Sequence, residues 1–148
     1  MTFQTLGRYA LIVLPAILIG LSGYTFYYAK GYSYFLDDPK ACVNCHVMRE
    51  NYIAWEVSSH RSVSCNGCHV PHHPISKWYV KAENGFRHSY VFTFENPQVF
   101  RLASIGERTV EANCIRCHQP VLSGIFHGGE QEGRQRCFDC HRGVGHAF

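Results

Sequence analysis

The residues in this chain best suited to chemistry are its cysteines, which all occur in four Cys-x-x-Cys-His motifs. The motifs begin at Cys42, Cys65, Cys114 and Cys137 and use all eight cysteines of the 148-residue sequence. In such a motif the two thiols form thioethers with the vinyl groups of a porphyrin, and the adjacent histidine binds the iron. A disulfide framework, or a zinc or redox dithiol site, predicts no histidine after each pair. The pattern therefore predicts four covalently bound haem c groups.

Each predicted haem has two attaching cysteines and one motif histidine. The attaching pairs are Cys42 and Cys45, Cys65 and Cys68, Cys114 and Cys117, and Cys137 and Cys140. The motif histidines are His46, His69, His118 and His141. The opposite face of each iron needs another ligand, and the remaining side chains of a suitable type are Met48, His60, His72, His73, His88, His127 and His146.

Short tethers restrict this choice. Met48 is two residues from His46, so it approaches the same porphyrin face and competes with His46 for the first iron. A similar tether argues against His72 and His73 as opposite-face ligands of the second haem, although either could bind a propionate or reach a neighbouring haem. His60 and His146 lie on flexible stretches, and we expect both to bind iron.

The N-terminal segment predicts a membrane span. No charge occurs between Arg8 and Lys30, and the 21 residues from Tyr9 to Ala29 would form a helix about 31 Å long, which matches a bilayer core. Aromatic residues crowd its far end, as expected at a headgroup boundary. No small-residue cleavage site follows the run, which argues against a removed signal peptide. We expect residues 1–30 to form an uncleaved anchor.

The remaining residues, 31–148, are expected to form a tetrahaem cytochrome c domain on the periplasmic side, because haem is attached to this motif outside the bacterial cytoplasmic membrane. Fewer than about 30 residues per haem cannot build an ordinary apolar core, so the porphyrins must supply it. The expected fold is mostly α and irregular, with a single N-terminal transmembrane helix and a compact multihaem domain. The modest net charge of +3, without a basic stripe, predicts no nucleic-acid partner.

Three further patterns resemble a known family. The first motif reads Cys-x-x-Cys-His-x-Met up to Met48, the second continues as Val-Pro-His-x-Pro from Val70 to Pro74, and a Ser-Ser-His-Arg stretch contains His60 and Arg61. In combination with the single anchor, these are similar to the NapC/NirT family of membrane-anchored quinol dehydrogenases. Four haems and a compact length most resemble the small subunit of cytochrome c nitrite reductase.

The resemblance implies that the chain oxidises menaquinol and passes electrons to a periplasmic multihaem reductase, in the nearest case the pentahaem nitrite reductase. It implies that Met48 binds the first haem instead of His46, and that His60 and His146 bind the third and second haems. The fourth haem would then take a ligand from the partner reductase, a lysine in the case that the family suggests. His127 is the internal alternative.

The predicted quinol site lies in residues 77–94. If this segment is helical, Lys77, Lys81, Asn84 and His88 share one face. Quinol oxidation releases two protons and two electrons, so a hydrogen-bonding base must lie beside the electron acceptor. The family has a lysine matching Lys81 and usually an aspartate where this chain has His88. We expect Lys81 and His88 to be the catalytic residues, with His88 acting as proton acceptor or binding the first iron.

Two other functional classes fit the sequence. A pure electron-transfer relay without a quinol site, or a NapC-type donor to another reductase, would keep the haems and the anchor. A terminal reductase would have an open haem of its own.

Overall fold

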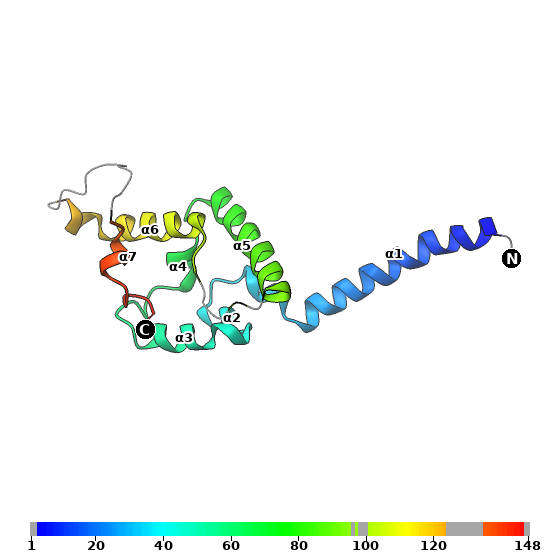
Figure 1. Cartoon of the computed structure of the whole chain (residues 1–148), viewed down its shortest axis with the longest axis horizontal. Helices are drawn as coiled ribbons and strands as arrows, with labels where there is room; N and C mark the ends of the chain where they lie inside the picture. Colours follow the sequence, from blue (N-terminus) through cyan, green and yellow to red (C-terminus); the bar gives the residue numbers. More distant parts are fainter. Residues whose placement is uncertain (1–2, 96, 98–100, 124–134, 147–148) are drawn as a thin grey trace.

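The structure is a computed structural model that describes residues 3–95, 97, 101–123 and 135–146. Within these ranges the chain forms helices and no strand, which confirms the predicted fold class. The elements are α1 (Phe3–Tyr28), the 3-10 helix η1 (Gly31–Phe35), α2 (Pro39–Cys42), the 3-10 helix η2 (His46–Met48), α3 (Arg49–Glu56), α4 (Cys65–His69), α5 (Pro74–Phe94), α6 (Ser104–Leu122) and α7 (Cys137–Cys140). Figure 1 shows α1 projecting from a cluster formed by the other helices.

The anchor is a single long helix that makes few contacts with the rest of the chain. Its segment Gly7–Tyr28 is long and apolar enough to cross a membrane, and its side chains are exposed. The helix ends at a tight turn in which Lys30 adopts a left-handed backbone with φ 52°. Gly31 follows, and a Cβ atom there would lie 2.5 Å from the Phe26 ring. A larger residue at this position would require the Phe26 ring to shift.

The cluster of shorter helices has very little apolar core of its own. Among the described residues, Val70 and Val80 are the only buried apolar side chains. A domain of this size normally depends on apolar burial, so the polypeptide alone supplies little of that contact. Its helices are held instead by specific polar contacts and by the groups that the motifs bind.

The packing of α4 against α6 depends on one such contact. Asn113 is 7% exposed, and its side-chain amide donates to the Cys68 carbonyl at 2.9 Å and to the Val70 carbonyl at 3.0 Å. Both carbonyls lie at the C-terminal end of α4, where helical carbonyls lack intrahelical partners. Asn113 therefore joins the second motif to the third.

The substitution Asn113→Leu should destabilise the protein, because it leaves two backbone carbonyls without that donor. We expect a loss of about 1–3 kcal/mol in the free energy of unfolding, measured by chemical denaturation of the haem-loaded protein. Gln119→Ala, at an exposed position on the same helix, is the matched control and should change stability little. Equal stability of the Asn113→Leu variant and the parent would contradict this role.

Candidate functional site

The four motifs lie in helices or at their ends, and three of these sites are on short helices with a side-chain cap. The first spans the end of α2 and the start of η2, the second forms α4, the third lies inside α6, and the fourth forms α7. Asp38 caps α2 by accepting from the Lys40 amide, and Ser64 caps α4 by accepting from the Gly67 amide. Arg136 and Asp139 form a reciprocal cap on α7. Such caps start a helix where it has too few turns to be stable alone.

Thiols of consecutive motifs lie close enough to affect one another. Cys42 of the first motif hydrogen-bonds Cys65 of the second, which lowers the pKa of Cys42 to about 7. Burial, followed by the thiol of Cys117, raises the pKa of Cys68. Burial, followed by the thiol of Cys137, raises the pKa of Cys114 to about 11. The motifs therefore follow one another in space in their sequence order, from the end of α1 to α7 (Figure 1).

In three motifs, a residue between the two cysteines contacts a more N-terminal part of the chain. Asn44 donates to the Ala29 carbonyl at 2.8 Å, which joins the first motif to the end of α1. Asn66 donates to Asp37 Oδ1 at 2.6 Å. Arg116 contacts His72 Nε2 at 2.7 Å, just after the second motif.

The fourth motif is joined to α6 by its flanking residues. Arg136 pairs with Glu107 at 2.6 Å. Glu111 accepts from the Cys137 amide at 2.9 Å, and its other oxygen lies 3.2 Å from the Cys137 sulfur. A carboxylate therefore lies directly beside a predicted thioether of the fourth haem.

Two predicted axial ligands lie close together at the third motif. The rings of His60 and His118 have centres 5.9 Å apart. Two imidazoles that bind one metal ion from opposite sides, with bonds of about 2 Å, have ring centres about 6 Å apart. Trp55 sets the loop that carries His60, because its indole donates to the His60 and Val63 carbonyls. Ser59 Oγ lies 3.0 Å from His60 Nδ1, which leaves Nε2 for a metal.

A second pair has the same geometry at the second motif. The ring centres of His69 and His146 are 6.0 Å apart. His146 Nδ1 lies 3.0 Å from the Asn51 carbonyl, which only accepts hydrogen bonds, so Nδ1 carries the proton and Nε2 has the lone pair. Burial, followed by the nearby rings of His146 and His88, lowers the pKa of His69 to about 4. The neutral imidazole is the form that binds iron.

Both histidine pairs fit an iron in position and chemistry. Haem c is the group that the motifs imply, and these pairs would hold it at the second and third motifs.

At the first motif, either His46 or Met48 could bind the iron, as the sequence predicts. His46 is exposed, whereas Met48 is half-buried two residues further along η2. Asn51 Nδ2 lies 4.0 Å from the Met48 sulfur, a contact that orients the thioether. These contacts bring Met48 and His146 to the same residue, Asn51, on α3.

Four histidines besides His88 belong neither to these two pairs nor to the first motif. His72 lies beside Arg116, and His73 is an exposed residue at the start of α5. His141 follows α7 and is exposed. His127 lies outside the described residues.

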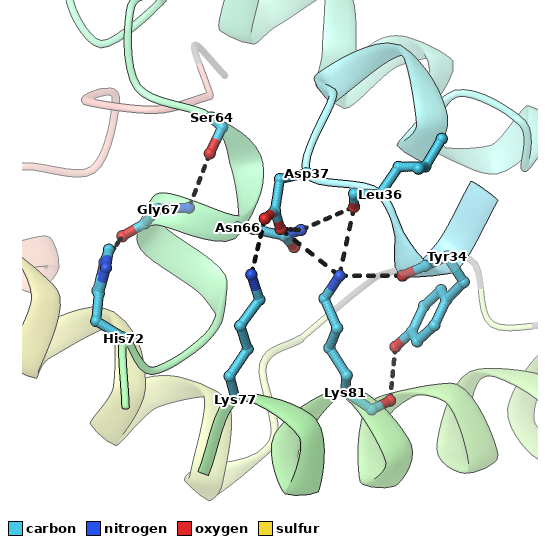
Figure 2. Close-up of polar contacts among 9 residues, drawn as sticks. All are labelled: Tyr34, Leu36, Asp37, Ser64, Asn66, Gly67, His72, Lys77 and Lys81. Carbon is cyan, nitrogen blue, oxygen red and sulfur yellow. Dashed lines mark hydrogen bonds and ion pairs between the residues drawn. The ribbon is translucent and has the colours of Figure 1, made fainter. Parts of the chain in front are cut away.

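The predicted helix at residues 77–94 is present as α5, and its inner face holds a polar clamp (Figure 2). Lys81 is 4% exposed, and its ammonium donates to the Tyr34 carbonyl at 3.0 Å and the Leu36 carbonyl at 3.3 Å. The Tyr34 hydroxyl donates in return to the Lys81 carbonyl at 2.9 Å. We call Tyr34, Asp37, Lys77 and Lys81 the α5 clamp.

Asp37 is the anionic centre of the α5 clamp. Its carboxylate lies 2.7 Å from Lys77 Nζ and 3.7 Å from Lys81 Nζ. The hydrogen bond from Lys77, then that from Asn66, lowers the pKa of Asp37. Burial lowers the pKa of Lys81, although the Asp37 charge opposes this shift. The thiol of Cys42 also acts on Lys81, so the clamp lies beside the first motif.

His88 shares the inner face of α5 but has different surroundings. Its side chain is exposed, and its ring contacts Phe92 edge-on with centres 5.9 Å apart. Desolvation lowers the pKa of His88, which favours the neutral ring with a lone pair for a proton or a metal. The structure thus separates the two predicted catalytic residues, since Lys81 is enclosed and His88 is open.

Sequence reasoning missed Asp37, Asn66, Glu111 and Asn113, which all contact a motif or the α5 clamp. Asp37 had one signal, because it precedes the first motif at the predicted membrane end of the domain. The other three are ordinary polar residues, and nothing in their spacing indicates a partner.

Comparison with known proteins identifies the group to which the chain is similar. The NrfH cytochrome c-type protein of Wolinella succinogenes is 35% identical, over 93% of this chain and 85% of that protein. The cytochrome c nitrite reductase subunit NrfH of Nitratidesulfovibrio vulgaris is 34% identical, over 76% of this chain and 69% of that protein.

A solved structure has a similar fold. It is the crystal structure of a cytochrome c nitrite reductase NrfHA complex bound to the HQNO inhibitor, with a TM-score of 0.64, 30% identity, and coverage of 93% of this chain and 90% of that chain. The family model for the N-terminal region of the NapC/NirT cytochrome c family matches residues 5–148. The chain belongs to the NapC/NirT family of c-type cytochromes.

Proposed function

We propose that this chain is a membrane-anchored tetrahaem quinol dehydrogenase that takes electrons from menaquinol and passes them to a periplasmic multihaem reductase, the catalytic subunit of cytochrome c nitrite reductase. The observation that carries the proposal is the spatial order of the motifs. The first is fastened to the end of the apolar helix through Asn44, and the fourth lies at the far end beside α6. Such an order suits electron entry at a membrane and exit away from it. The similarity to NrfH proteins and to the NrfHA complex supports the choice of partner.

Different residues of the chain would attach the haems, bind their irons and dock the reductase. The paired cysteines attach the four haems, His69 with His146 and His118 with His60 bind the second and third irons, and Met48 or His46 binds the first. Haem, when bound, supplies an iron that carries one electron at a time between its ferric and ferrous states. The exposed His141 at α7 belongs to the fourth haem, and the surface around it would dock the reductase and gain a ligand from it.

Quinol oxidation also requires that two protons leave. His88 is exposed on the inner face of α5, and its lowered pKa favours the neutral ring, so it can accept the first proton from a quinol hydroxyl. Lys81 cannot accept one while protonated, and its ammonium is occupied by two carbonyls. Its role is to fix the loop around Tyr34 and to place a positive charge where the quinol anion forms.

A second candidate is the relay without a quinol site. The enclosure of Lys81 favours it, because a lysine bound to two backbone carbonyls has an adequate structural role. The two functions differ in whether loss of His88 affects electron entry from quinol alone.

The axial-ligand assignments can be tested by electron paramagnetic resonance. His60→Ala and His146→Ala should each convert one low-spin haem to high spin, because each removes an imidazole from one pair. The parent protein is expected to contain at least one high-spin or weakly ligated haem already, at the first motif. His73→Ala, at an exposed residue, is the control and should leave every haem unchanged. A parent spectrum with four low-spin bis-histidine haems, or unchanged spectra in both ligand variants, would contradict the assignments.

The quinol site can be tested with the full chain in liposomes. His88→Leu and Lys81→Leu should slow menaquinol oxidation strongly, about 100-fold for loss of a proton acceptor. Reduction of the haems by dithionite should change little. His73→Ala, at an exposed residue outside the α5 clamp, is the control and should leave menaquinol oxidation unchanged.

Lys81 has two proposed roles, which are to fix the loop around Tyr34 and to place a positive charge beside the quinol. Asp37→Asn separates them, because it weakens the α5 clamp but keeps the lysine. Quinol turnover equal to that of the parent in both leucine variants would favour the relay. Equal loss of quinol and dithionite reduction would indicate a damaged haem chain.

Glu111 should lower the reduction potential of the fourth haem, because a nearby negative charge stabilises the ferric state. Glu111→Gln removes the charge while keeping an acceptor for the Cys137 amide. We expect the potential of one haem to rise by roughly tens of millivolts, as expected for a unit charge at an effective dielectric constant near 20. Spectroscopic redox titration measures this shift. Glu107→Gln, which alters the contact with Arg136, is the control, and an unchanged titration for Glu111→Gln would exclude the effect.

A further inference from the structure

The outer face of α5 exposes a row of apolar and aromatic side chains that Glu83 interrupts. They are Ile75, Tyr79, Phe86, Tyr90 and Phe94, with exposed fractions of 77%, 66%, 78%, 52% and 73%. Their spacing of four, seven, four and four residues places them on one side of the helix. We call these five residues the α5 stripe. Soluble surfaces rarely expose an apolar row of this length without a partner.

The α5 stripe points away from the haem-binding helices. Lys77 and Lys81, on the opposite side of α5, point toward Asp37 and Asn66 (Figure 2). Figure 1 shows that α5 lies on the side of the cluster from which α1 leaves and runs crosswise to α1. If α1 spans a bilayer, a helix in this position lies along the surface of that bilayer.

Aromatic contacts connect the end of α1 to the start of α5. The rings of Phe26 on α1 and Phe35 on η1 have centres 6.4 Å apart, and those of Phe35 and Trp78 on α5 are 5.9 Å apart. Such rings are typical of the boundary between lipid tails and water. These contacts join the end of α1 to Trp78, the residue before Tyr79 of the α5 stripe. Arg87, exposed at the border of the stripe, provides a cation for lipid phosphates.

We propose that α5 is a second membrane contact, which lies in the headgroup region with the α5 stripe buried among the upper acyl chains. An amphipathic helix with one aromatic face and one polar face is suited to this position. The contact fixes the tilt of the haem domain, because one span alone leaves the domain free to lean. It places the α5 clamp and His88 close to the lipid surface. The proposal rests on the position of α5 and does not depend on quinol oxidation.

Site-specific photocrosslinking in intact membranes tests directly whether lipid covers the α5 stripe. The full chain is produced with its reductase, and p-benzoylphenylalanine replaces Phe86 in one variant and Tyr90 in another. Val57, which is 75% exposed and lies at the end of α3, is replaced in the control variant. Haem staining of the purified proteins confirms that each variant is folded and loaded. After irradiation, mass spectrometry identifies the adducts.

We expect phospholipid adducts at positions 86 and 90, about tenfold more abundant than at position 57, because lipid surrounds a helix in the interface. Three results would overturn the proposal. The first is a crosslink from both stripe positions to the reductase or to a second copy of the chain, since a protein would then cover the stripe. The second is the absence of any adduct at both stripe positions. The third is an equal amount of lipid adduct at positions 57, 86 and 90.

Discussion

The haem domain depends on polar contacts that join each motif to a neighbouring part of the chain. The described residues bury almost no apolar side chains, so the positions of the helices cannot follow from burial alone. Asn44, Asn66, Arg116 and Glu111 each connect one motif to the end of α1, to Asp37, to His72 or to the next motif. A geometry set by such contacts is specific, because each hydrogen bond forms only when its donor and acceptor meet at a narrow range of distance and angle. The relative positions of the cofactor sites are therefore encoded by the residues inside and beside the attachment motifs.

Several features could be predicted from the sequence because each depends on local chemistry. The run from Tyr9 to Ala29 and the helical pattern after Lys77 both depend on spacing along the chain, and both are present as helices. Motif combinations that span most of the chain predict the NapC/NirT family, to which the chain belongs. That resemblance pairs His60 with the third haem and His146 with the second, and the positions of the rings support both pairings.

Other features could not be predicted because they depend on contacts between distant residues. Nothing in the sequence indicates that Asn113 lies under the end of α4, or that Asp37 lies between two lysines 40 and 44 residues further along. The helical pattern correctly places Lys81 and His88 on one face, but it cannot tell that one is enclosed and the other open. That difference arises from the loop at Tyr34, which covers only the first half of α5. It determines which of the two residues is free to exchange a proton.

The short connection between α1 and η1 determines how the protein can meet its partners. Only Ala29 and Lys30 separate the two helices, and the Ala29 carbonyl is bound by Asn44 of the first motif. A cytochrome on a long flexible linker searches a volume above the membrane that grows with linker length. Here the tether has almost no reach, so the domain cannot shuttle between donor and acceptor. Electron transfer must therefore occur at a fixed height above the bilayer, and any acceptor has to be brought to that height and held there.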